Sequence, residues 1–517
     1  MSDKKSINVV WFKRDFRVSD HAPLYQASLE DIPVLPLYII EPDLWEQPDY
    51  AQRHWHFIYD CLVELNKKLE DLGQGLIIKH GNALDVFDDL SERYDIRNIF
   101  AHEETGNGWS YERDKEVSRF LQSQSISFKE YPTNGVVRGL KDRDEWAKQR
   151  NVRMAEALIP KLEKLHVIEE KSEQIPKKDD AFFGAPLEGQ VQQGGRQAGL
   201  KILKSFLYDR AEQYVYSMSA PEPSEIYCSR LSPHLTWGTL SSREVVYQLK
   251  KRRNELTVNE KHWKRHLTAF QSRLSWRCHF VQKLEQQPSI EFECMHPGFE
   301  GMRESEFNEE YFKAWKEGCT GYPLIDACMK SLTHQGWITF RMRAMLVSFA
   351  SYHLWLDWRR TAYHLATLFT DYEPGIHYSQ MQMQSGVTGI NTLRIYNPIK
   401  QSEDHDPEGR FIKKWLPELK DVPPLFIHTP WEMTILEQQD ASCLLGKDYP
   451  LPIVDHKDAV AKARQKIAEV QKQDSFHEQA KEVYQKLGSR NRPLSRRVKK
   501  MRSKQIKEES NQLALFD

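Results

Sequence analysis

Cysteine is sparse in this sequence, and its cysteines are not grouped. There are seven in 517 residues, at Cys61, Cys228, Cys278, Cys294, Cys319, Cys328 and Cys443. No two are spaced as C-x-x-C, and their number is odd. A disulfide framework or an iron–sulfur or zinc cluster needs paired or closely spaced cysteines, so neither is indicated. We expect reduced, mostly buried thiols and no metal site.

Long apolar runs and an excess of one charge are also missing. No stretch is apolar for long enough to span a membrane, and the start, MSDKKSINVVWF, lacks the basic-then-apolar order of an export signal. We therefore expect a cytoplasmic protein, and a monomer, without a membrane partner. Because the net charge is −1, a nucleic-acid partner would have to be held by a local basic patch.

The chain is too long for one core, so we predict two domains. Residues 1–135 alternate β-rich runs (INVVWF, PVLPLYII, GLIIKH and NIFAHE) with helical spacing. This order predicts an α/β domain with a doubly wound parallel sheet. No G-x-G-x-x-G follows the first run, so a dinucleotide fingerprint is absent and a ligand is expected at the carboxyl ends of the strands.

The rest of the chain divides by composition. Residues 136–198 are predicted to be a connector and linker, because much of this stretch is charged, aperiodic and rich in Gly, Pro and Gln. Residues 199–487 have helical periodicity and predict an all-α domain. Residues 488–517 form a basic tail.

Arginines interrupt the apolar faces of this helical domain. A core-facing stripe runs through residues 263–284, and Arg277 falls on it. A second helix, predicted over residues 336–356, carries Arg341 and Arg343. Internal salt bridges to Asp357, Asp371 or Glu373 would satisfy these cations, and so would a bound anion. Three such arginines in one domain favour an internal anionic ligand.

Two neighbouring features are consistent with that ligand. Arg273, Trp276 and Phe280 form a second row beside the stripe that could line the edge of a cavity. The stretch CSRLSPHLTWGTLSSRE, from residue 228, places serines and a proline before helical runs. Helix N-termini with free N–H groups and hydroxyls suit a diphosphate, although most such starts are simply caps.

Several long motifs in this order resemble those of the photolyase/cryptochrome flavoprotein family. They are VVWFKRDFRVSDHAPL (9–24), SRLSPHLTWGTLS (229–241), SWRCHF (275–280), AWKEGCTGYPLIDACMKSLTHQGWITFRMR (314–343) and LRIYNPIKQSEDHDPEGRFIKKWLPEL (393–419). The resemblance spans nearly the whole chain. It implies an N-terminal α/β domain that can hold an antenna pigment and a C-terminal helical domain that binds FAD.

The resemblance also implies roles for particular residues. Those expected to contact or lie beside the cofactor are Tyr216, Cys228, Ser229, Arg230, Leu231, Ser232, Phe270, Arg273, Arg277, Phe340, Arg343, Asp371, Glu373 and His377. In the family, blue light excites reduced FAD, which donates an electron to a pyrimidine dimer flipped out of DNA. Trp276 is the expected stacking wall for the flipped bases.

The stretch HYSQMQM departs from the family pattern at the electron-transfer chain. His377 replaces the asparagine near the flavin N5, and Met381 replaces the tryptophan nearest the flavin. Trp358 matches the middle tryptophan, and the outer one is lost near Ser305. A thioether is a poor one-electron donor, so we favour a packing substitution in a protein reduced by another route. Trp337, Tyr352 and Trp355 are candidates for that route.

Other departures bear on the substrate. Arg273 stands where cyclobutane-dimer photolyases place a glutamate, Phe340 replaces an asparagine, and the paired histidines of 6-4 repair are missing. The expected function is light-driven repair of pyrimidine dimers in DNA, with the cyclobutane dimer as the favoured substrate. A cryptochrome-like photoreceptor that binds FAD without repair is the alternative, followed by a nucleic-acid-binding helical protein with a vestigial flavin pocket.

Two further partners are expected. Glu104 lies where some relatives contact an antenna, which would be a folate, a deazaflavin or a flavin. Near the C-terminus, Gln512, Leu513, Leu515 and Phe516 resemble the short peptide with which bacterial repair proteins bind the DNA sliding clamp. The basic run before this peptide would act as a tether, and the peptide itself indicates a bacterial source.

Overall fold

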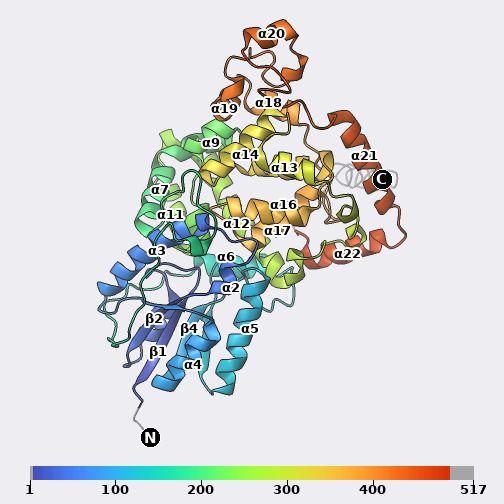
Figure 1. Cartoon of the computed structure of the whole chain (residues 1–517). Coiled ribbons are helices and arrows are strands. Elements are labelled where there is room, and N and C mark those ends of the chain that lie inside the picture. Colours follow the sequence, from blue (N-terminus) through green and yellow to red (C-terminus); the bar gives the residue numbers. More distant parts are fainter. Residues whose placement is uncertain (1–3, 490–517) are drawn as a thin grey trace, which may run out of the picture.

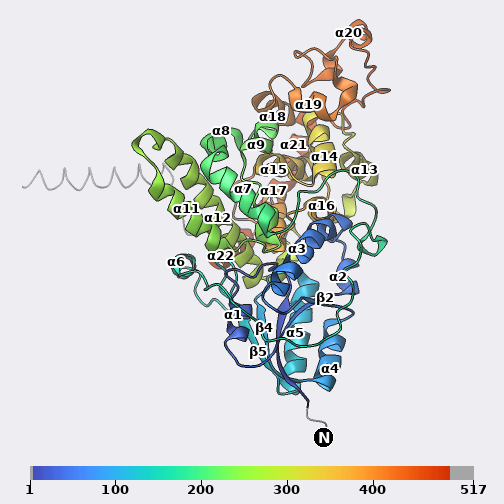
Figure 2. The ribbon, with the colours of Figure 1, turned by 90° about the vertical axis from the view of Figure 1, so that its left-hand side faces the viewer.

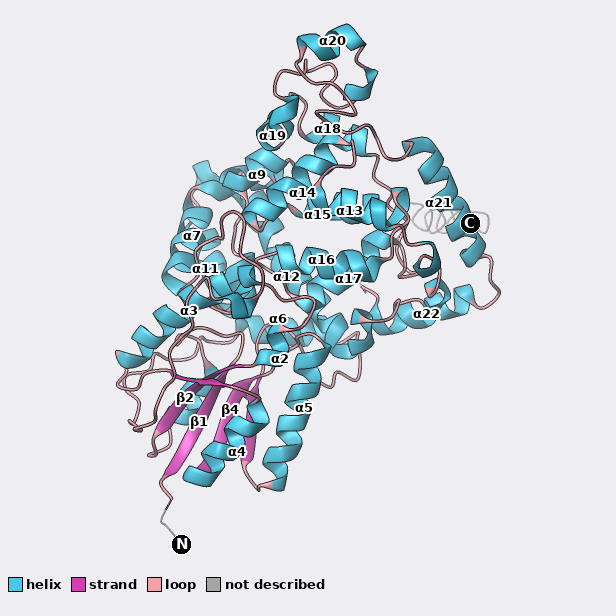
Figure 3. Cartoon of the chain, in the orientation of Figure 1, coloured by secondary structure: helices cyan, strands magenta, loops and turns pink. Residues whose placement is uncertain are grey.

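The structure, a computed structural model, describes residues 4–489. Its strands are confined to the first part of the chain, and nearly everything after it is helical (Figure 3). The basic run and the clamp-like peptide lie outside the described residues, so the clamp contact stays a prediction. Within residues 4–489, no helix combines the length and apolar character needed to cross a membrane.

The first part is built on a parallel sheet with the order β3-β2-β1-β4-β5. Its strands are β1 (Ser6–Phe12), β2 (Val34–Ile40), β3 (Ile77–His80), β4 (Asp95–His102) and β5 (Ser127–Tyr131). The predicted fold class is confirmed. Sequence analysis missed β5, because this edge strand reads SFKEY and is only half-buried, without the apolar run of the central strands.

Helices cover both faces of the sheet (Figure 1). On one face lie α4 (Ala83–Arg93) and α5 (Gly108–Ser123), where the Trp11 and Phe87 rings meet edge-on at 5.2 Å. On the other lie α1 (Ala22–Ser28) and α3 (Gln52–Glu70); the short α2 (Pro42–Trp45) follows β2. The apolar cluster of this second face continues into the helical part, so the two parts share one core.

The connector packs against the sheet instead of hanging free. It contains α6 (Trp146–Ala155) and then runs irregularly along the β3 edge. There, the Glu173 N–H donates to Ile78 O at 3.0 Å, and the Ile78 N–H donates to Ser172 Oγ at 2.9 Å. These bonds satisfy backbone groups of an otherwise open edge strand.

In the helical part, α12 packs against α17 on one side and against α11 on the other, and Figure 2 shows the α11–α12 pair at one side of this part. Its helices are α7 (Arg196–Tyr208), α8 (Tyr214–Ser217), α9 (Pro221–Tyr227), α10 (Ser232–Thr236), α11 (Ser242–Glu255), α12 (Trp263–Gln286), α13 (Glu309–Glu317), α14 (Pro323–Gln335), α15 (Phe340–Ser348), α16 (Trp358–Leu368), α17 (Pro374–Ser385), α18 (Pro398–His405), α19 (Arg410–Trp415), α20 (Ile435–Asp440), α21 (His456–Gln471) and α22 (Phe476–Leu487). The apolar stripe predicted on α12 is buried throughout, from Trp263 to Leu284.

The helix predicted over residues 336–356 is wrong at both ends. It begins at Phe340 because the Thr339 hydroxyl caps it, accepting from the Met342 N–H at 3.3 Å. After Ser348 the chain forms one π-helical turn, Phe349–His353, and Trp355 then takes a positive φ of 54°. Periodicity alone does not reveal such a turn, because the residues on both sides of it are buried.

The crossing of α12 and α17 depends on Gly375. A Cβ atom there would lie 2.6 Å from the Cα of Val281, which is backbone and cannot move aside locally. We therefore expect Gly375→Ala to lower the free energy of unfolding by about 1–3 kcal/mol through overpacking. Urea unfolding would measure it. Gly75→Ala is the matched control, since its nearest neighbour is the Asn66 side chain at 3.3 Å, and equal stability of the two variants would contradict the prediction.

Candidate active site

A deep cavity opens in the helical part, beside α12, α15 and α17. Its empty volume is about 1490 Å³ including its open mouth. The chain around α10 and the loop leading into α17 complete the walls. The walls are mainly apolar and aromatic, with a few charged groups, which is the usual composition of a site for a large organic ligand.

Two ion pairs lie in the wall of this cavity, and of their four side chains only Arg343, at 23% exposed, is not buried. Arg277 Nη2 lies 2.5 Å from Glu373 Oε2 and also donates to Leu235 O at 2.9 Å. Arg343 Nη2 lies 3.0 Å from Asp371 Oδ2, and its Nε donates to Ile338 O at 3.0 Å. The two alternatives predicted from the sequence, internal salt bridges and contact with a bound anion, are therefore compatible. These arginines have internal acidic partners and also face the cavity.

Some buried polar atoms in the wall have no protein partner. They are Arg277 Nε, Asp371 Oδ1, Gln380 Nε2 and Gln384 Oε1. Leaving a buried donor or acceptor unpaired costs about 1–3 kcal/mol. Donors and acceptors both remain, so a ligand that carries both kinds of group fits this wall.

Arg341 does not join this set, and the prediction that it points inward is wrong. Its side chain is half-exposed, 5.5 Å over the Tyr396 ring, and does not line the cavity. The neighbouring position 342 faces the core instead, because successive helix residues point about 100° apart. Asp357 is also elsewhere, paired with Arg359 at 3.1 Å.

Arg230 and Arg273 supply the further cations of the cavity. Arg230 lies in the left-handed region with a φ of 57°, a strained conformation for a non-glycine residue. Its guanidinium covers the Trp337 ring at 4.2 Å, and burial lowers its pKa to about 10. Backbone strain at a ligand-facing arginine is typical of functional sites.

Of the residues predicted around Arg230, Cys228, Ser229 and Ser232 line the cavity, whereas Leu231 and Tyr216 do not. Leu231 is fully buried in an apolar cluster, and Tyr216 is 65% exposed near Arg265. Tyr214 lines the cavity instead, because residues two apart on the one-turn helix α8 face different sides. Phe270 lines it too, with its ring 4.8 Å from that of Phe206.

The mouth of the cavity carries two exposed aromatic side chains. Trp276 is 46% exposed and Phe340 is 47% exposed. The Arg273 guanidinium lies 4.2 Å over the Trp276 ring. Exposed aromatic rings at a cavity mouth are suited to stacking on a flat ligand.

His377 and Met381 line the cavity from α17. His377 Nε2 lies 2.9 Å from Ala362 O, and burial lowers its pKa to about 4, so its ring is neutral at pH 7. Met381 is 2% exposed. Trp358 does not reach the cavity; its indole N–H donates to Cys294 Sγ at 3.4 Å.

Of the three candidates for another reduction route, only Trp337 lines the cavity. The rings of Tyr352 and Trp355 lie 5.8 and 4.6 Å from the buried Arg303 guanidinium. They are therefore not in contact with a ligand of this cavity.

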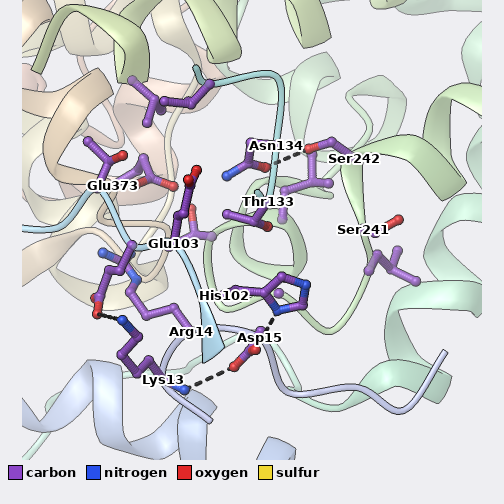
Figure 4. Close-up of a pocket in the computed structure, with 18 of the residues that line it drawn as sticks. Lys13, Arg14, Asp15, His102, Glu103, Thr133, Asn134, Ser241, Ser242 and Glu373 are labelled. Atoms are coloured by element: carbon purple, nitrogen blue, oxygen red, sulfur yellow. Dashed lines mark hydrogen bonds and ion pairs between the residues drawn. The ribbon is translucent and has the colours of Figure 1, made fainter. Parts of the chain in front are cut away.

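Glu104 lies at a second, much smaller pocket between the sheet and the helical part. It pairs with Arg113 at 2.8 Å, and Figure 4 shows Glu373 facing His102 and Glu103 across this pocket. Its empty volume, counted in the same way, is about 680 Å³, less than half of that of the large cavity. An antenna pigment at Glu104 stays a prediction.

Family models match both parts of the chain. The FAD binding domain of DNA photolyase matches residues 270–469, and the DNA photolyase model matches residues 8–158. The chain belongs to the photolyase/cryptochrome flavoprotein family. Its cofactor is FAD, and the arginines, hydroxyls and unpaired amides of the large cavity suit a ligand with a diphosphate and a polar aromatic ring.

Individual family members resemble this one over nearly their full length. A deoxyribodipyrimidine photo-lyase of Alkalihalophilus pseudofirmus is 28% identical, over 90% of this chain and 98% of the relative. A cryptochrome DASH of Natronomonas pharaonis is 27% identical, over 86% and 98%. The structure of an archaeal photolyase from Sulfolobus tokodaii with two FAD molecules superposes with a TM-score of 0.74 at 28% identity, over 90% and 100%.

Sequence reasoning missed several cavity residues. Tyr214, Gln380 and Gln384 line the cavity but were not proposed. For the glutamines a signal existed, since Gln380 and Gln384 are four residues apart on α17 and so share a face with His377. The contribution of Tyr214 depends on how α8 is rotated, which only packing determines.

Proposed function

We propose that this protein is a light-driven, FAD-dependent enzyme that repairs pyrimidine dimers in DNA, with cyclobutane dimers as its main substrate. The observation that carries the proposal is the exposed aromatic pair, Trp276 and Phe340, at the mouth of the FAD cavity. A receptor that only senses light does not need stacking surfaces for bases at this entrance, whereas a base-flipping enzyme does.

The chain's own residues have distinct proposed roles in binding the cofactor. Ser229, Arg230 and Ser232 hold the diphosphate, together with the free Nε of Arg277. The Arg343–Asp371 pair lies beside the flavin ring and supplies a fixed positive charge there. Reduced FAD, when bound and excited by blue light, supplies the electron that splits the dimer.

Other residues would bind the damaged DNA. Trp276 and Phe340 stack on the flipped bases, and Arg273 donates hydrogen bonds to pyrimidine carbonyl oxygens. Arg341, beside the mouth, forms no ion pair with a described acidic residue and is half-exposed. It can therefore contact a backbone phosphate.

Repair itself tests the proposal directly. The protein is purified in the dark, reduced chemically, and illuminated with an oligonucleotide that contains cyclobutane dimers, and restored thymines are counted. Restoration supports the enzyme. Bound flavin without restoration supports a cryptochrome-like photoreceptor, which Arg273 in place of the usual glutamate also favours. A colourless protein supports a nucleic-acid-binding protein without cofactor function.

Removal of the stacking wall should weaken substrate binding strongly. Base–aromatic stacking contributes about 1–3 kcal/mol per base, so Trp276→Ala should raise the Kd for dimer-containing DNA about 5- to 150-fold. Fluorescence anisotropy with labelled oligonucleotide would measure it. Tyr247→Ala removes a comparably exposed ring on α11, away from the cavity, and should bind normally. Equal binding by both variants would contradict the role of Trp276.

A further inference from the structure

A buried carboxylate lies between two tyrosines where the α/β and helical parts meet. Asp49, which follows α2, is 1% exposed. Its Oδ2 accepts a short hydrogen bond from the Tyr372 hydroxyl and a longer one, at 3.3 Å, from the Tyr378 hydroxyl. The Asn107 amide donates to both carboxylate oxygens at 3.1 and 3.2 Å. Both phenol rings are buried as well.

Asp49 has no cation to balance it among the described residues. None of the described lysine, arginine or histidine side chains forms an ion pair with it. A buried acid close enough to interact with it, Glu291, has its pKa raised to about 8 by burial, so it is mainly protonated at pH 7. Burial likewise raises the pKa of Asp49 above its usual value. An unbalanced buried carboxylate is costly to the fold, but it is a good proton acceptor for a phenol bonded to it.

Tyr372 joins this carboxylate to the FAD cavity. It is one of the cavity-lining residues, and its ring meets that of His377 edge-on, with 5.3 Å between centroids. His377 lines the same cavity and is neutral at pH 7. The usual aromatic donor is missing at Met381, and Trp358 does not reach the cavity. Trp337 does line it, but the Arg230 guanidinium lies 4.2 Å over its ring, and this positive charge disfavours loss of an electron from the indole. Tyr372 thus lines the cavity of the flavin, and its hydroxyl is hydrogen-bonded to a proton acceptor, Asp49.

We propose that Tyr372 is the electron donor that photoreduces the flavin of this protein, with Asp49 as its proton acceptor. Under blue light, Tyr372 gives one electron to the excited, oxidised flavin. Its O–H bond breaks and the proton moves to Asp49 Oδ2, which leaves a neutral tyrosyl radical and a protonated Asp49. A thiolate in solution then supplies one electron to the radical, and Asp49 returns the proton to the phenolic oxygen. The net change is one electron from thiolate to flavin.

This inference rests on the FAD cofactor and not on DNA repair, so the two can fail separately. Repair is tested on protein that was reduced chemically, which bypasses photoreduction. Photoreduction is tested without DNA, on protein that carries oxidised FAD. The flavin-to-protein ratio is measured first for each variant, so that a binding defect is not mistaken for a loss of electron transfer.

The decisive variant is Tyr372→Phe, which keeps the ring and removes the acidic proton. Under blue light with excess thiol, the absorption of oxidised flavin should disappear more slowly in this variant than in the wild-type protein, by on the order of tenfold or more. The wild-type protein should show a tyrosyl radical by electron paramagnetic resonance and slower photoreduction in D₂O. Tyr372→Phe should show neither, while dithionite still reduces its flavin fully.

The chain offers a closely matched control. Tyr449 is another buried tyrosine whose hydroxyl donates to a buried carboxylate, Asp326 Oδ2, at 2.6 Å, but neither residue lines the cavity. Tyr449→Phe should photoreduce at the wild-type rate. Asp49→Asn keeps Tyr372 and removes the proton acceptor, so it should also be slow and lose the D₂O effect.

Two results would overturn the proposal. One is a wild-type photoreduction rate in Tyr372→Phe that carries a full complement of flavin. The other is loss of photoreduction in Trp358→Phe together with a tryptophanyl, not a tyrosyl, radical in the wild-type protein, which would show that electrons still pass from Trp358 despite Met381.

Discussion

Acidification to about pH 5 is expected to destabilise this protein severely. The cause is a set of buried or mostly buried histidines whose pKa values lie far below the ordinary 6.5. Burial lowers the pKa of His54, His353 and His364 to about 3, and that of His234 and His377 to about 4. Each of these rings is therefore neutral in the folded protein under ordinary conditions.

The direction of the effect follows from proton binding. Below pH 6.5 the unfolded chain takes up protons on these histidines and the folded protein does not, so protons favour unfolding. Their contribution to stability is complete above pH 6.5 and is lost as the pH falls toward 3–4. At pH 5 each histidine costs about 2 kcal/mol, and together they approach the 5–15 kcal/mol that holds a typical domain folded.

Several acids with raised pKa values, Asp49 among them, act in the opposite direction. Burial raises the pKa of Asp326 to about 6 and that of Glu291 to about 8, so the folded protein gains stability as these groups are protonated. The acids with raised pKa values are fewer than the histidines with lowered pKa values, so they offset only part of the loss of stability. The net effect should be a steep fall in Tm between about pH 6.5 and 5.

Thermal unfolding followed by circular dichroism across this range would measure the effect. His54 is the best single probe, because its Nδ1 accepts from the Ala51 N–H and its Nε2 lies 3.1 Å from Phe369 O. A proton on Nδ1 would point at the Ala51 N–H. His54→Gln should therefore show a shallower dependence of Tm on pH, whatever its stability at pH 7.5. A Tm that stays constant or rises on acidification would refute the expectation.

The second large effect is expected at the Arg277–Glu373 pair. Both side chains are less than 10% exposed, so Arg277→Met leaves the Glu373 carboxylate buried without its cation. Breaking a buried pair from one side costs about 3–5 kcal/mol. The same change removes a cation from the FAD cavity. We expect Arg277→Met to unfold at a much lower urea concentration and to be purified with little flavin.

Two further variants separate these effects. In the double variant Arg277→Met, Glu373→Gln no charge is left unpaired, so most of the stability should return while flavin binding stays weak. Arg360→Met breaks an exposed pair with Glu309 and should cost about 0–1 kcal/mol. If Arg277→Met were as stable as Arg360→Met and kept its flavin, the pair would have neither role.

Part of the fold could be predicted from the sequence, because the pattern of apolar residues in one strand or helix depends on which of its own faces are buried. Strands β1 to β4 are runs of apolar residues, which is what a strand covered on both faces requires. The stripe on α12 reports one buried helix face. Strand β5 and the π-helical turn after α15 were not predicted. A polar edge strand and an interrupted buried helix have no distinct periodicity of apolar residues.

The residues of the candidate site could be predicted from residue patterns only where they lie on the same helix. Arg277 falls on the apolar stripe of the long helix α12, whereas His377 and Met381 were predicted only from the resemblance, and all three line the cavity. Tyr216 and Arg341 were misplaced because a short helix and a partly exposed one have no clear inner face. The choice between Tyr214 and Tyr216 depends on the rotation of a single helical turn.

By itself, then, the sequence determined the α/β and helical halves, the family and its cofactor, and the presence of a methionine at position 381. Only the tertiary structure decided which charges and phenols meet. Arg277 and Glu373 are 96 residues apart in the chain, and Asp49 and Tyr372 are 323 apart. The physical reason is that periodicity arises from the backbone geometry of one element. Contacts between distant residues depend on how elements pack against one another, and that is set by the shape of the whole core.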